Sequence, residues 1–337
     1  MKIAIISVSN KGKKLANELK IMLNFDSTVI KCDLYHKNVK KYFPILFNEY
    51  DAIIAIMASG ILIRSIAPLL ESKITDPAVI NLDDNGKFVI STLSGHLGGA
   101  NELTLKVSDL IGATPVITTS TDVNRKLGID VLARDLYLSI DNPEEILFFN
   151  KAILEGREIS LTVNPNKNFK YLFEYLNKNT LEIDVSIYYS SKINTNEILV
   201  NIDEHELILK EKKIVVGIGC RLGKEFEYIY DGVKNSLKQL KLTPSRVNMF
   251  ASAEIKKDEN GILELSKRLD VPVNFVELDK LKLFKSEDVS KSDFVFSKFG
   301  IYGVCEPSAL IMAGFDSKLI YKKTSYDGVT IAVAVSN

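Results

Sequence analysis

Apolar and amphipathic stretches alternate along residues 1–122. A continuous apolar run at Lys2–Val8 predicts a buried strand, and Lys11–Asn24 carries leucines at every fourth position, as one face of a helix does. The same order continues with strands expected at Thr28–Lys31, Asp51–Ile56, Ala78–Leu82, Phe88–Ser91 and Pro115–Thr118, and helices at Val39–Phe47, Ile61–Leu70 and Ala100–Ile111. The sequence Asp83-Asp84-Asn85-Gly86 predicts a hairpin turn between two of these strands. Strand–helix alternation predicts an N-terminal, doubly wound α/β domain.

The pattern weakens between residues 123 and 212, where glycine is rare and Asn, Lys and Tyr are frequent. We expect a helix at Pro143–Glu155 and a strand at Ile159–Val163. The stretch is interpreted as a small, separate α/β middle region. None of its residues suggests chemistry.

A second alternation of strands and helices begins at Ile214–Ile218 and predicts a C-terminal α/β domain over residues 213–337. The further strands expected are Val247–Ala253, Val273–Val276, Leu319–Lys323 and Val329–Val335, and the helices are Glu225–Leu240, Ile262–Leu269 and Ser308–Ala313. The two α/β domains do not obviously repeat one another.

Composition narrows the class of protein. The 43 basic and 43 acidic side chains balance to zero, which argues against a nucleic-acid binder because such proteins usually carry a basic excess. No apolar run approaches the length that spans a bilayer, and the chain opens directly on an expected strand, so we expect neither a membrane segment nor a cleaved signal. Three cysteines far apart fit a reducing compartment, and the cytoplasm is the expected location.

A polar, glycine-rich turn before the expected helix Ala100–Ile111 is the first candidate site. It combines a hydroxyl, an imidazole, a carboxamide and a carboxylate with two adjacent glycines: Ser94, His96, Asn101, Glu102, Gly98 and Gly99. An imidazole can exchange a proton near pH 7, and amides at a helix N-terminus can bind an anion. The structural alternatives are a histidine that caps a backbone group and a first-turn acid favoured by the helix dipole.

Three other turns also follow expected strands, where open α/β sheets bind ligands: Ala58–Gly60, Thr118–Asp122 and Gly217–Gly223. The hydroxyl run ending in Asp122 is either a helix N-cap cluster or a binder of carboxylates and water. Arg64 is either solvated or a carboxylate clamp.

The glycines of the third turn miss the dinucleotide fingerprint by one residue, so we expect no nicotinamide cofactor. Arg221 is the better candidate in this turn, because Cys220 has no histidine near it in sequence and is interpreted as a buried thiol. Glu306 lies in a loop just before an expected helix. We expect no metal site, since the three histidines fall in separate units.

Several motifs, in order along the chain, resemble the cobalamin-biosynthesis CbiG family. They are Gly60-Ile-x-Ile-Arg64-x-Ile-Ala-Pro, Thr75-Asp-Pro-Ala-Val79, Ser94-Gly-His-x-Gly-Gly-Ala-Asn-Glu102, Pro115-Val-Ile-Thr-Thr-x-Thr-Asp122, Gly217-Ile-Gly-Cys-Arg221, Glu259-x-Gly261 and Gly303-Val-Cys-Glu-Pro-x-Ala-Leu310. The family usually has alanine where this chain has Cys305. The resemblance covers the whole chain and is least diagnostic in the middle region.

The resemblance implies a cobalt-precorrin-5A hydrolase of anaerobic cobalamin biosynthesis. Such an enzyme opens a δ-lactone on the macrocycle and releases acetaldehyde, giving cobalt-precorrin-5B. No organic cofactor is implied, because the cobalt belongs to the substrate. The implied partner is an anionic cobalt-tetrapyrrole, with a homodimer and transient contacts with neighbouring pathway enzymes left open.

Roles for individual residues are hypotheses from this chemistry. We expect His96 to act as general base, Glu102 to orient it or take a second proton, and Ser94, Asn101 and the amides of Gly98 and Gly99 to stabilise an oxyanion. The expected substrate-binding set is Gly60, Arg64, Gly98, Gly99, Asn101, Thr119, Thr121, Asp122, Gly219, Arg221 and Glu306. The competing hypothesis is a carrier that binds corrinoid intermediates without chemistry of its own, with His96 as an axial ligand of the substrate's cobalt.

Overall fold

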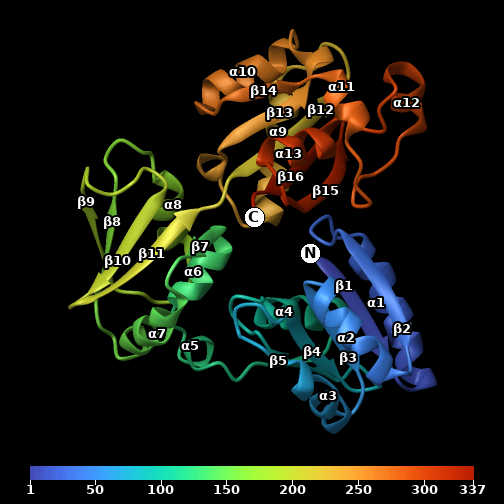
Figure 1. Ribbon diagram of the computed structural model, residues 1–337, viewed down its shortest axis with the longest axis vertical. Coiled ribbons are helices and arrows are strands. Elements are labelled where there is room, and N and C mark those ends of the chain that lie inside the picture. The colour runs from blue at the N-terminus through green and yellow to red at the C-terminus, as the bar shows by residue number, and fades with distance from the viewer. The chain divides into compact units, whose positions relative to one another are not determined.

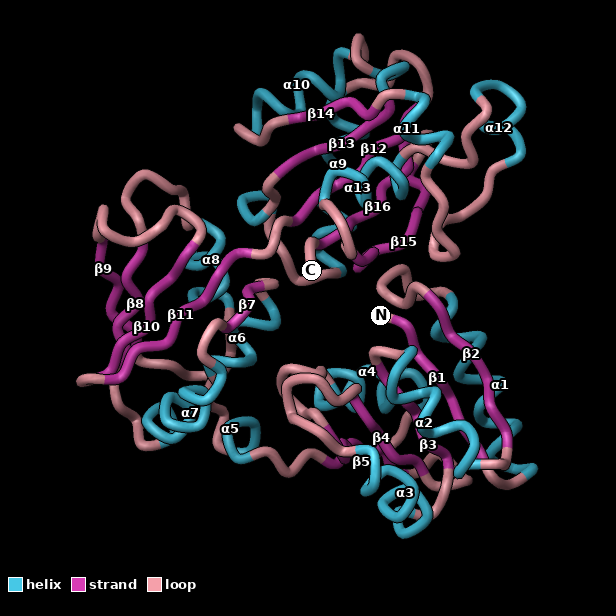
Figure 2. Tube along the Cα trace, in the orientation of Figure 1, coloured by secondary structure: helices cyan, strands magenta, loops and turns pink.

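The computed structural model describes residues 1–337, apart from the side chain of Phe294, and contains three β-sheets with packed helices (Figure 1 and Figure 2). The chain forms two compact units. The first comprises residues 1–134, 140–164 and 180–209, and the second comprises residues 135–139, 165–179 and 210–337. The stretch 123–212, expected as one separate region, is thus shared between the two units.

The first sheet has the order β2-β1-β3-β4-β5-β6. Its strands are β1 (Lys2–Ser7), β2 (Lys31–His36), β3 (Ala52–Ile56), β4 (Ala78–Leu82), β5 (Phe88–Leu93) and β6 (Thr114–Val116), and its helices are α1 (Asn10–Asn24), α2 (Val39–Glu49), α3 (Ser59–Ile66) and α4 (Ala100–Ile111). Alternate residues of β1 point to opposite faces: Ile3 and Ile5 pack with α1 and α4, whereas Ala4 and Ile6 pack with α2 and α3. The expected doubly wound α/β domain is confirmed.

Strand direction changes within this sheet. β1, β2, β3 and β4 are parallel, but β5 runs antiparallel to β4 and β6 runs parallel to β5. The reversal occurs at the expected turn 83–86, where the Asp83 carboxylate accepts the backbone N–H groups of Asn85, Lys87 and Phe88. The carboxyl ends of β5 and β6 therefore lie at the edge opposite to those of β1, β3 and β4.

The prediction of a strand at Thr28–Lys31 is wrong, because β2 begins only at Lys31. Asp26 Oδ1 accepts both the backbone N–H and the hydroxyl of Thr28, which makes residues 26–28 a turn. β2 is an edge strand with a largely polar sequence, so it shows no apolar run from which it could be predicted.

The second sheet has the order β7-β11-β10-β8-β9. Its strands are β7 (Leu138–Ile140), β8 (Ile159–Val163), β9 (Val185–Tyr189), β10 (Glu197–Ile202) and β11 (His205–Glu211), and the helices along this stretch are α5 (Ser120–Val123), α6 (Ile129–Asp135), α7 (Ile146–Leu154) and α8 (Lys170–Lys178). The expected strand matches β8, and the expected helix matches α7 together with a preceding 3₁₀ turn. The other elements are short and have mixed composition, which left no clear period to predict them.

The third sheet has the order β14-β13-β12-β16-β15. Its strands are β12 (Ile214–Cys220), β13 (Met249–Ala253), β14 (Val273–Val276), β15 (Lys318–Tyr326) and β16 (Val329–Val335), with helices α9 (Phe226–Gln239), α10 (Asn260–Leu269), α11 (Leu278–Leu283), α12 (Asp293–Phe299) and α13 (Cys305–Ala313). The expected C-terminal α/β domain is confirmed, and α13 begins three residues before the expected Ser308.

Glycine lets α13 lie directly on β12. A Cβ atom at Gly217 would fall 1.9 Å from the carbonyl oxygen of Cys305, a distance that backbone atoms cannot relieve. This glycine therefore has a packing role in the core of the second unit.

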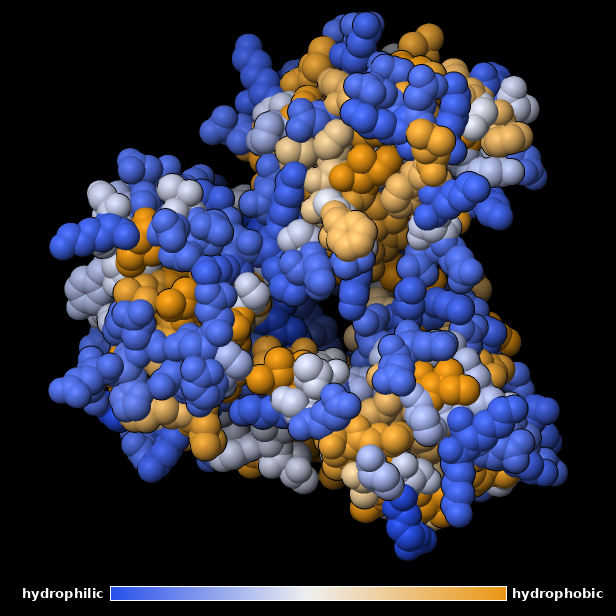
Figure 3. All heavy atoms as spheres, viewed as in Figure 1, coloured by the Kyte–Doolittle hydropathy of each residue, from blue (hydrophilic) through white to orange (hydrophobic). Residues whose placement is uncertain are grey.

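The surface is mixed in character. The face in Figure 3 is mainly hydrophilic, with hydrophobic side chains in separate patches. Exposed apolar side chains scattered in this way are ordinary for folded proteins. Within the described part of the chain, every helix is too short or too polar to cross a membrane.

Arg246 is almost fully buried in the second unit. Its guanidinium donates hydrogen bonds to the carbonyl oxygens of Leu136, Tyr137 and Lys212 and to Oδ1 of Asn248, at 2.7–3.0 Å. The contacts fix residues 135–139 and the strand-connecting segment at Lys212 against the region that leads into β13. One buried side chain thus donates to four acceptors, of which Asn248 Oδ1 and the carbonyl oxygen of Tyr137 also accept the backbone N–H groups of Ile214 and Lys212.

We predict that Arg246→Met destabilises the second unit by about 3 kcal/mol, because four hydrogen bonds of a buried guanidinium are lost and the buried carbonyl oxygen of Leu136 is left without this donor, at about 1–3 kcal/mol for each such loss. Denaturant unfolding followed by circular dichroism measures the change. Arg268→Met is the control, since Arg268 is half exposed and pairs on the surface with Glu264, and its effect should stay below about 1 kcal/mol. Equal effects of the two variants would contradict the interpretation that the buried hydrogen bonds of Arg246 stabilise the second unit.

Candidate active site

Two of the turns expected to carry the site lie together. β5 and β6 are parallel neighbours, so their carboxyl ends adjoin at one edge of the first sheet. The turn after β5 carries His96, and the segment after β6 carries Thr119, Thr121 and Asp122. Hydrogen bonds between the two segments confirm that they form one cluster.

The His96 ring lies between two carboxylates. Its Nε2 is 2.8 Å from Oδ2 of Asp122, and its Nδ1 is 3.0 Å from Oδ2 of Asp130. The hydroxyl of Thr121 is also 2.9 Å from Nε2. The side chains of His96 and Asp130 are 11% and 7% exposed, while that of Asp122 is 29% exposed. Asp122 is thus the member of the cluster that solvent reaches best.

This environment favours the protonated form of His96. Burial lowers the pKa of His96, but hydrogen bonds and charge interactions with Asp122 and Asp130 outweigh it and raise the pKa to about 9. Burial raises the pKa of the Asp130 carboxyl, yet its contacts with His96 and Asn150 leave that pKa below its ordinary value. Near neutral pH the cluster therefore contains an imidazolium, which donates N–H groups and cannot accept a proton.

The first turn of α4 is closed by its own loop. The backbone N–H groups of Gly99, Ala100 and Asn101 donate to the carbonyl oxygens of His96, Ser94 and Gly95. The amide of Gly99 is consequently occupied and does not form the free oxyanion seat expected for it.

The same loop is tightly packed around Ser94. Ser94 has a left-handed backbone, with φ of 55°, and its Oγ is buried without a hydrogen-bond partner among the described residues. A Cβ atom at Gly98 would lie 2.5 Å from Cβ of Ser94, so only glycine fits there. Ser94 and Gly98 therefore shape the loop, and the buried Ser94 hydroxyl does not reach the surface.

Asn101 joins the two strand ends. Its side-chain nitrogen donates to Thr119 Oγ1 at 2.9 Å and to Asp122 Oδ2 at 3.0 Å, and its oxygen accepts a hydrogen bond from Ser91. The residue is buried. Because its amide is used within the protein, Asn101 orients Asp122, a role different from the expected contact with an oxyanion.

Glu102 does not orient His96, as the sequence suggested it would. Its carboxylate lies 3.5 Å from Arg134, and Arg134 also donates to the carbonyl oxygen of His96. The side chain that orients the ring is Asp130, which approaches the opposite nitrogen from Asp122.

Gly60 and Arg64 belong to the other edge of the first sheet. α3 starts at the carboxyl end of β3, which is antiparallel to β5, and the Arg64 guanidinium lies 3.4 Å from where a Gly60 Cβ would stand. The expected substrate-binding set is therefore divided between two edges of this sheet, because Gly60 and Arg64 follow β3 whereas Asn101, Thr119 and Asp122 follow β5 and β6.

The candidates in the second unit are mostly structural. Gly219 is paired with Thr330 inside the sheet, and a Cβ atom there would lie 2.5 Å from the Thr330 hydroxyl. Glu306 is buried, and its oxygens accept hydrogen bonds from Ser290 and from the backbone N–H of Lys323. Gly219 and Glu306 therefore hold the fold together, whereas Arg221 is exposed.

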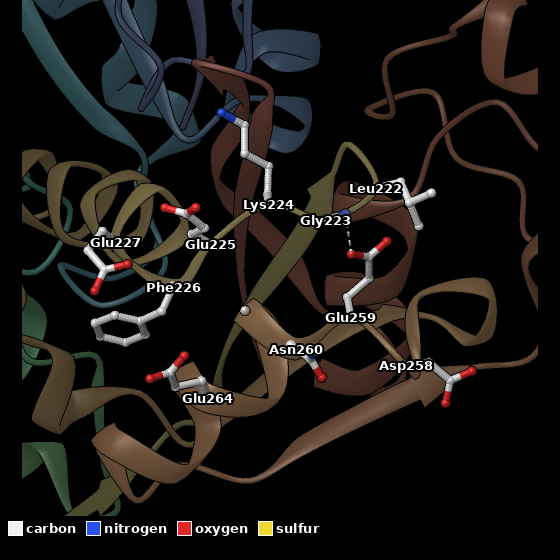
Figure 4. A pocket seen from close by; sticks show the side chains of 11 residues that line it. Leu222, Gly223, Lys224, Glu225, Phe226, Glu227, Asp258, Glu259, Asn260 and Glu264 are labelled. Carbon is white, nitrogen blue, oxygen red and sulfur yellow. Dashed lines mark hydrogen bonds between the residues drawn. The ribbon is translucent and has the colours of Figure 1, made fainter.

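A pocket of about 420 Å³ lies between the loop after β12 and the start of α10 (Figure 4). Its charged lining is mainly acidic: Lys224, Glu225, Glu227, Asp258, Glu259 and Glu264. Glu259 accepts the backbone N–H of Gly223 at 2.9 Å and pairs with Lys256 at 2.7 Å. This lining is unsuited to a polyanionic ligand.

The cysteines are not activated. Burial raises the pKa of the Cys220 thiol to about 11 and that of Cys305 to about 12. Both remain thiols near neutral pH, so neither is a nucleophile. Cys220 was expected to be a buried thiol, and the structure shows it half-buried.

Three residues of the cluster were not predicted: Asp130, Arg134 and Asn150. Asn150 donates to Asp130 Oδ1 at 3.0 Å and accepts the backbone N–H of Ile129. All three lie in a stretch of the sequence that carries no glycine-rich turn and no recognisable spacing. Nothing in the chain order indicated that they would meet His96.

Comparisons with known proteins agree on one family. Residues 41–122 match the model described as Cobalamin synthesis G N-terminal, and residues 214–334 match Cobalamin synthesis G C-terminus. The "Probable cobalt-precorrin-5A hydrolase" of Methanocaldococcus jannaschii is 35% identical over 100% of both chains. The "Cobalt-precorrin-5A hydrolase" of Priestia megaterium is 30% identical over 98% of this chain and 94% of its own.

A solved structure is similar over the full length. It is that of a cobalamin biosynthesis protein G homologue from Sulfolobus solfataricus, with 27% identity and a TM-score of 0.59, covering 100% of this chain and 97% of that chain. The fold class is therefore shared with that structure.

The raised pKa of His96 also predicts how stability depends on pH. A pKa of about 9 in the folded protein against 6.5 as the ordinary value means that His96 stabilises the fold fully below about pH 6.5. That contribution, at most about 3 kcal/mol, is lost as pH rises through about 9. Urea unfolding of the wild type and His96→Gln at pH 6 and pH 10 measures it, and a difference between the two proteins that does not shrink with pH would contradict it.

Proposed function

The chain belongs to the cobalamin synthesis G family, and we propose that it is a cobalt-precorrin-5A hydrolase. The reaction opens the δ-lactone on the macrocycle and cleaves a carbon–carbon bond to release acetaldehyde, leaving cobalt-precorrin-5B. The observation that carries this proposal beyond family membership is the His96–Asp122 pair, because it joins a carboxylate that solvent reaches to a protonated imidazole.

Asp122 is the general base in this proposal. Its Oδ2 is held by His96 and Asn101, whereas Oδ1 has no hydrogen-bond partner among the described residues. A carboxylate oxygen with free lone pairs and solvent access can accept a proton from water or from an alcohol. The hypothesis that His96 is the base gives way to this one, since the geometry and charge around His96 favour its cationic form.

His96 is the proton donor and electrostatic partner. Its Nε2–H points at Asp122. The pair can therefore take up a proton on Asp122 and give a proton to a leaving oxygen. The positive charge also stabilises negative charge that develops on the lactone oxygens.

The two steps balance with water as the only co-reactant. Water adds to the lactone carbonyl, Asp122 takes its proton, the acyl–oxygen bond breaks, and the alcohol oxygen receives a proton from the pair. In the second step the alcohol loses its proton to Asp122, the carbon–carbon bond breaks, and acetaldehyde leaves. The electron pair stays on the macrocycle carbon, which takes up a proton.

The substrate in this proposal is an anionic cobalt-tetrapyrrole, so the cobalt arrives with the substrate and no organic cofactor is needed. Thr119 is half-buried, and its hydroxyl accepts a hydrogen bond from Asn101, so its own proton can be donated to a carboxylate of the macrocycle.

Asp122→Asn should lower kcat for acetaldehyde release by about 100-fold or more, because the amide cannot accept the proton. Acetaldehyde is measured by coupled alcohol dehydrogenase with purified cobalt-precorrin-5A. Asp109→Asn, a substitution on the exposed part of α4, is the control and should leave kcat unchanged. Tight binding of the substrate by the wild type without any acetaldehyde would support the carrier hypothesis and contradict the proposed activity.

The rate should depend on pH through His96. We expect kcat/KM to fall above about pH 9, where the imidazolium loses its proton, and we expect His96→Gln to be slow and to lack this alkaline decrease. Initial rates between pH 6 and 10.5 test this. A wild-type rate that rises steadily through pH 9 would instead show that neutral His96 is the active form.

A further inference from the structure

The segment 128–134, supported by Asn150, packs against His96 within the first unit. Asp130 presents both carboxylate oxygens to Nδ1 of His96, at 3.0 and 3.1 Å. Gly128 lies so close that a Cβ atom there would be 3.4 Å from the His96 ring and 2.8 Å from Asp130. The backbone of this segment therefore forms a wall of the cluster.

Asp130 is itself held in place. Asn150 donates to its Oδ1 at 3.0 Å, and the backbone N–H of Val131 donates to the same oxygen at 3.1 Å. Asn150 in turn accepts the backbone N–H of Ile129, so α7 and the start of α6 are linked through one amide. A carboxylate this buried needs a positive partner, and His96 supplies it.

A second contact from the same segment fixes the backbone of His96. Arg134 Nη1 donates to the carbonyl oxygen of His96 at 2.7 Å, and its Nη2 lies 3.5 Å from the carboxylate of Glu102 on α4. The charged and titratable groups that face His96 are thus Asp122, Asp130, Arg134 and Glu102. They surround the ring, its backbone and the helix that follows.

We propose that Asp130 is a positioning residue that holds a proton on Nδ1 of His96 and aims Nε2 at Asp122, with Asn150 supporting Asp130. The role assigned to the ring rests on the proposed function. Residues 128–150 lie outside both ranges that the family models match, so the active site extends into the stretch from which the sequence predicted no chemistry.

The physical reason is tautomer control. The imidazolium carries a proton on each nitrogen, and when it gives one up the Asp130 carboxylate retains the proton on Nδ1, so Nε2 is the nitrogen that exchanges its proton with Asp122. Without Asp130 the ring can rotate or change tautomer, and its positive charge loses one of two counter-charges. Asparagine at position 130 keeps the size of the side chain but removes that charge.

Nitrogen-15 NMR of the histidine rings tests the proposal directly. The chain has only three histidines, so His36→Gln and His205→Gln assign the signals of His96. In Asp130→Asn we expect the pKa of His96 to fall from about 9 to below about 8, and kcat to fall about 10–100-fold with KM changed less than about threefold.

Glu145→Gln is the matched control. Glu145 lies 2.8 Å from Nδ1 of His205, and this is a carboxylate–imidazole pair outside the cluster. The substitution should move only the His205 signals and leave kcat unchanged. A change in kcat equal to that of Asp130→Asn would overturn the specific role of Asp130.

Asn150→Ala decides the matter if Asp130→Asn does not fold. It removes the support of Asp130 and should lower the pKa of His96 and kcat in the same direction, by smaller amounts. Unchanged His96 signals in whichever of these two variants folds would overturn the proposal. If the signals move but the wild type releases no acetaldehyde, the positioning role stands and the proposed function fails.

Discussion

The site of the first unit depends on an imidazolium held between two carboxylates. Burial alone favours neutral forms of His96 and Asp130, and each would be costly as an isolated charge. The interaction between the two charges offsets that cost. The His96 ring, the segment that carries Asp130 and the segment that carries Asp122 must therefore adopt their positions together. Electrostatic pairing therefore ties the turn after β5, the segment after β6 and α6 into one structure.

Regular, strongly periodic elements could be predicted from the sequence, and irregular ones could not. α4, β8, β14 and β16 have the expected bounds, because each is a clear apolar run or amphipathic repeat ended by a turn residue such as Gly112. The predicted position of β2 was wrong because an edge strand needs few apolar residues and so shows no apolar run in the sequence. Most of the short elements between residues 123 and 212 were missed for the lack of any sustained period.

The site was predictable where residue types at strand ends reveal it. His96 and Asp122 stand in polar turns after strands, and both belong to the cluster. Asp130 and Asn150 are ordinary residues 34 and 20 positions away from their partners in the chain, so only the fold brings them to His96 and to each other. The protonation of His96 was likewise beyond the sequence, because it depends on those unforeseen neighbours.

The direction of the strands explains why Gly60 and Arg64 lie away from His96, and the sequence analysis did not take it into account. The turn at residues 83–86 was recognised as a hairpin, and a hairpin reverses the chain. It follows that the strand after it ends at the opposite edge from the strand before it, as β5 and β4 do. The rule that ligands bind at carboxyl ends therefore selects two different edges in a mixed sheet, and only the edge of β5 and β6 carries His96.

Glu306, Glu259 and Asp122 all lie in motifs that resemble the family, but they differ in the hydrogen bonds that their carboxylate oxygens accept. Glu306 is buried and both of its oxygens accept hydrogen bonds from the protein, and both oxygens of Glu259 are likewise engaged. Each oxygen of these two carboxylates is thus already engaged by a donor of the protein. Asp122 keeps one oxygen without a partner among the described residues and retains access to solvent. A motif acid can act as a base only where the fold leaves it an unused oxygen, and that condition favours Asp122 over both glutamates.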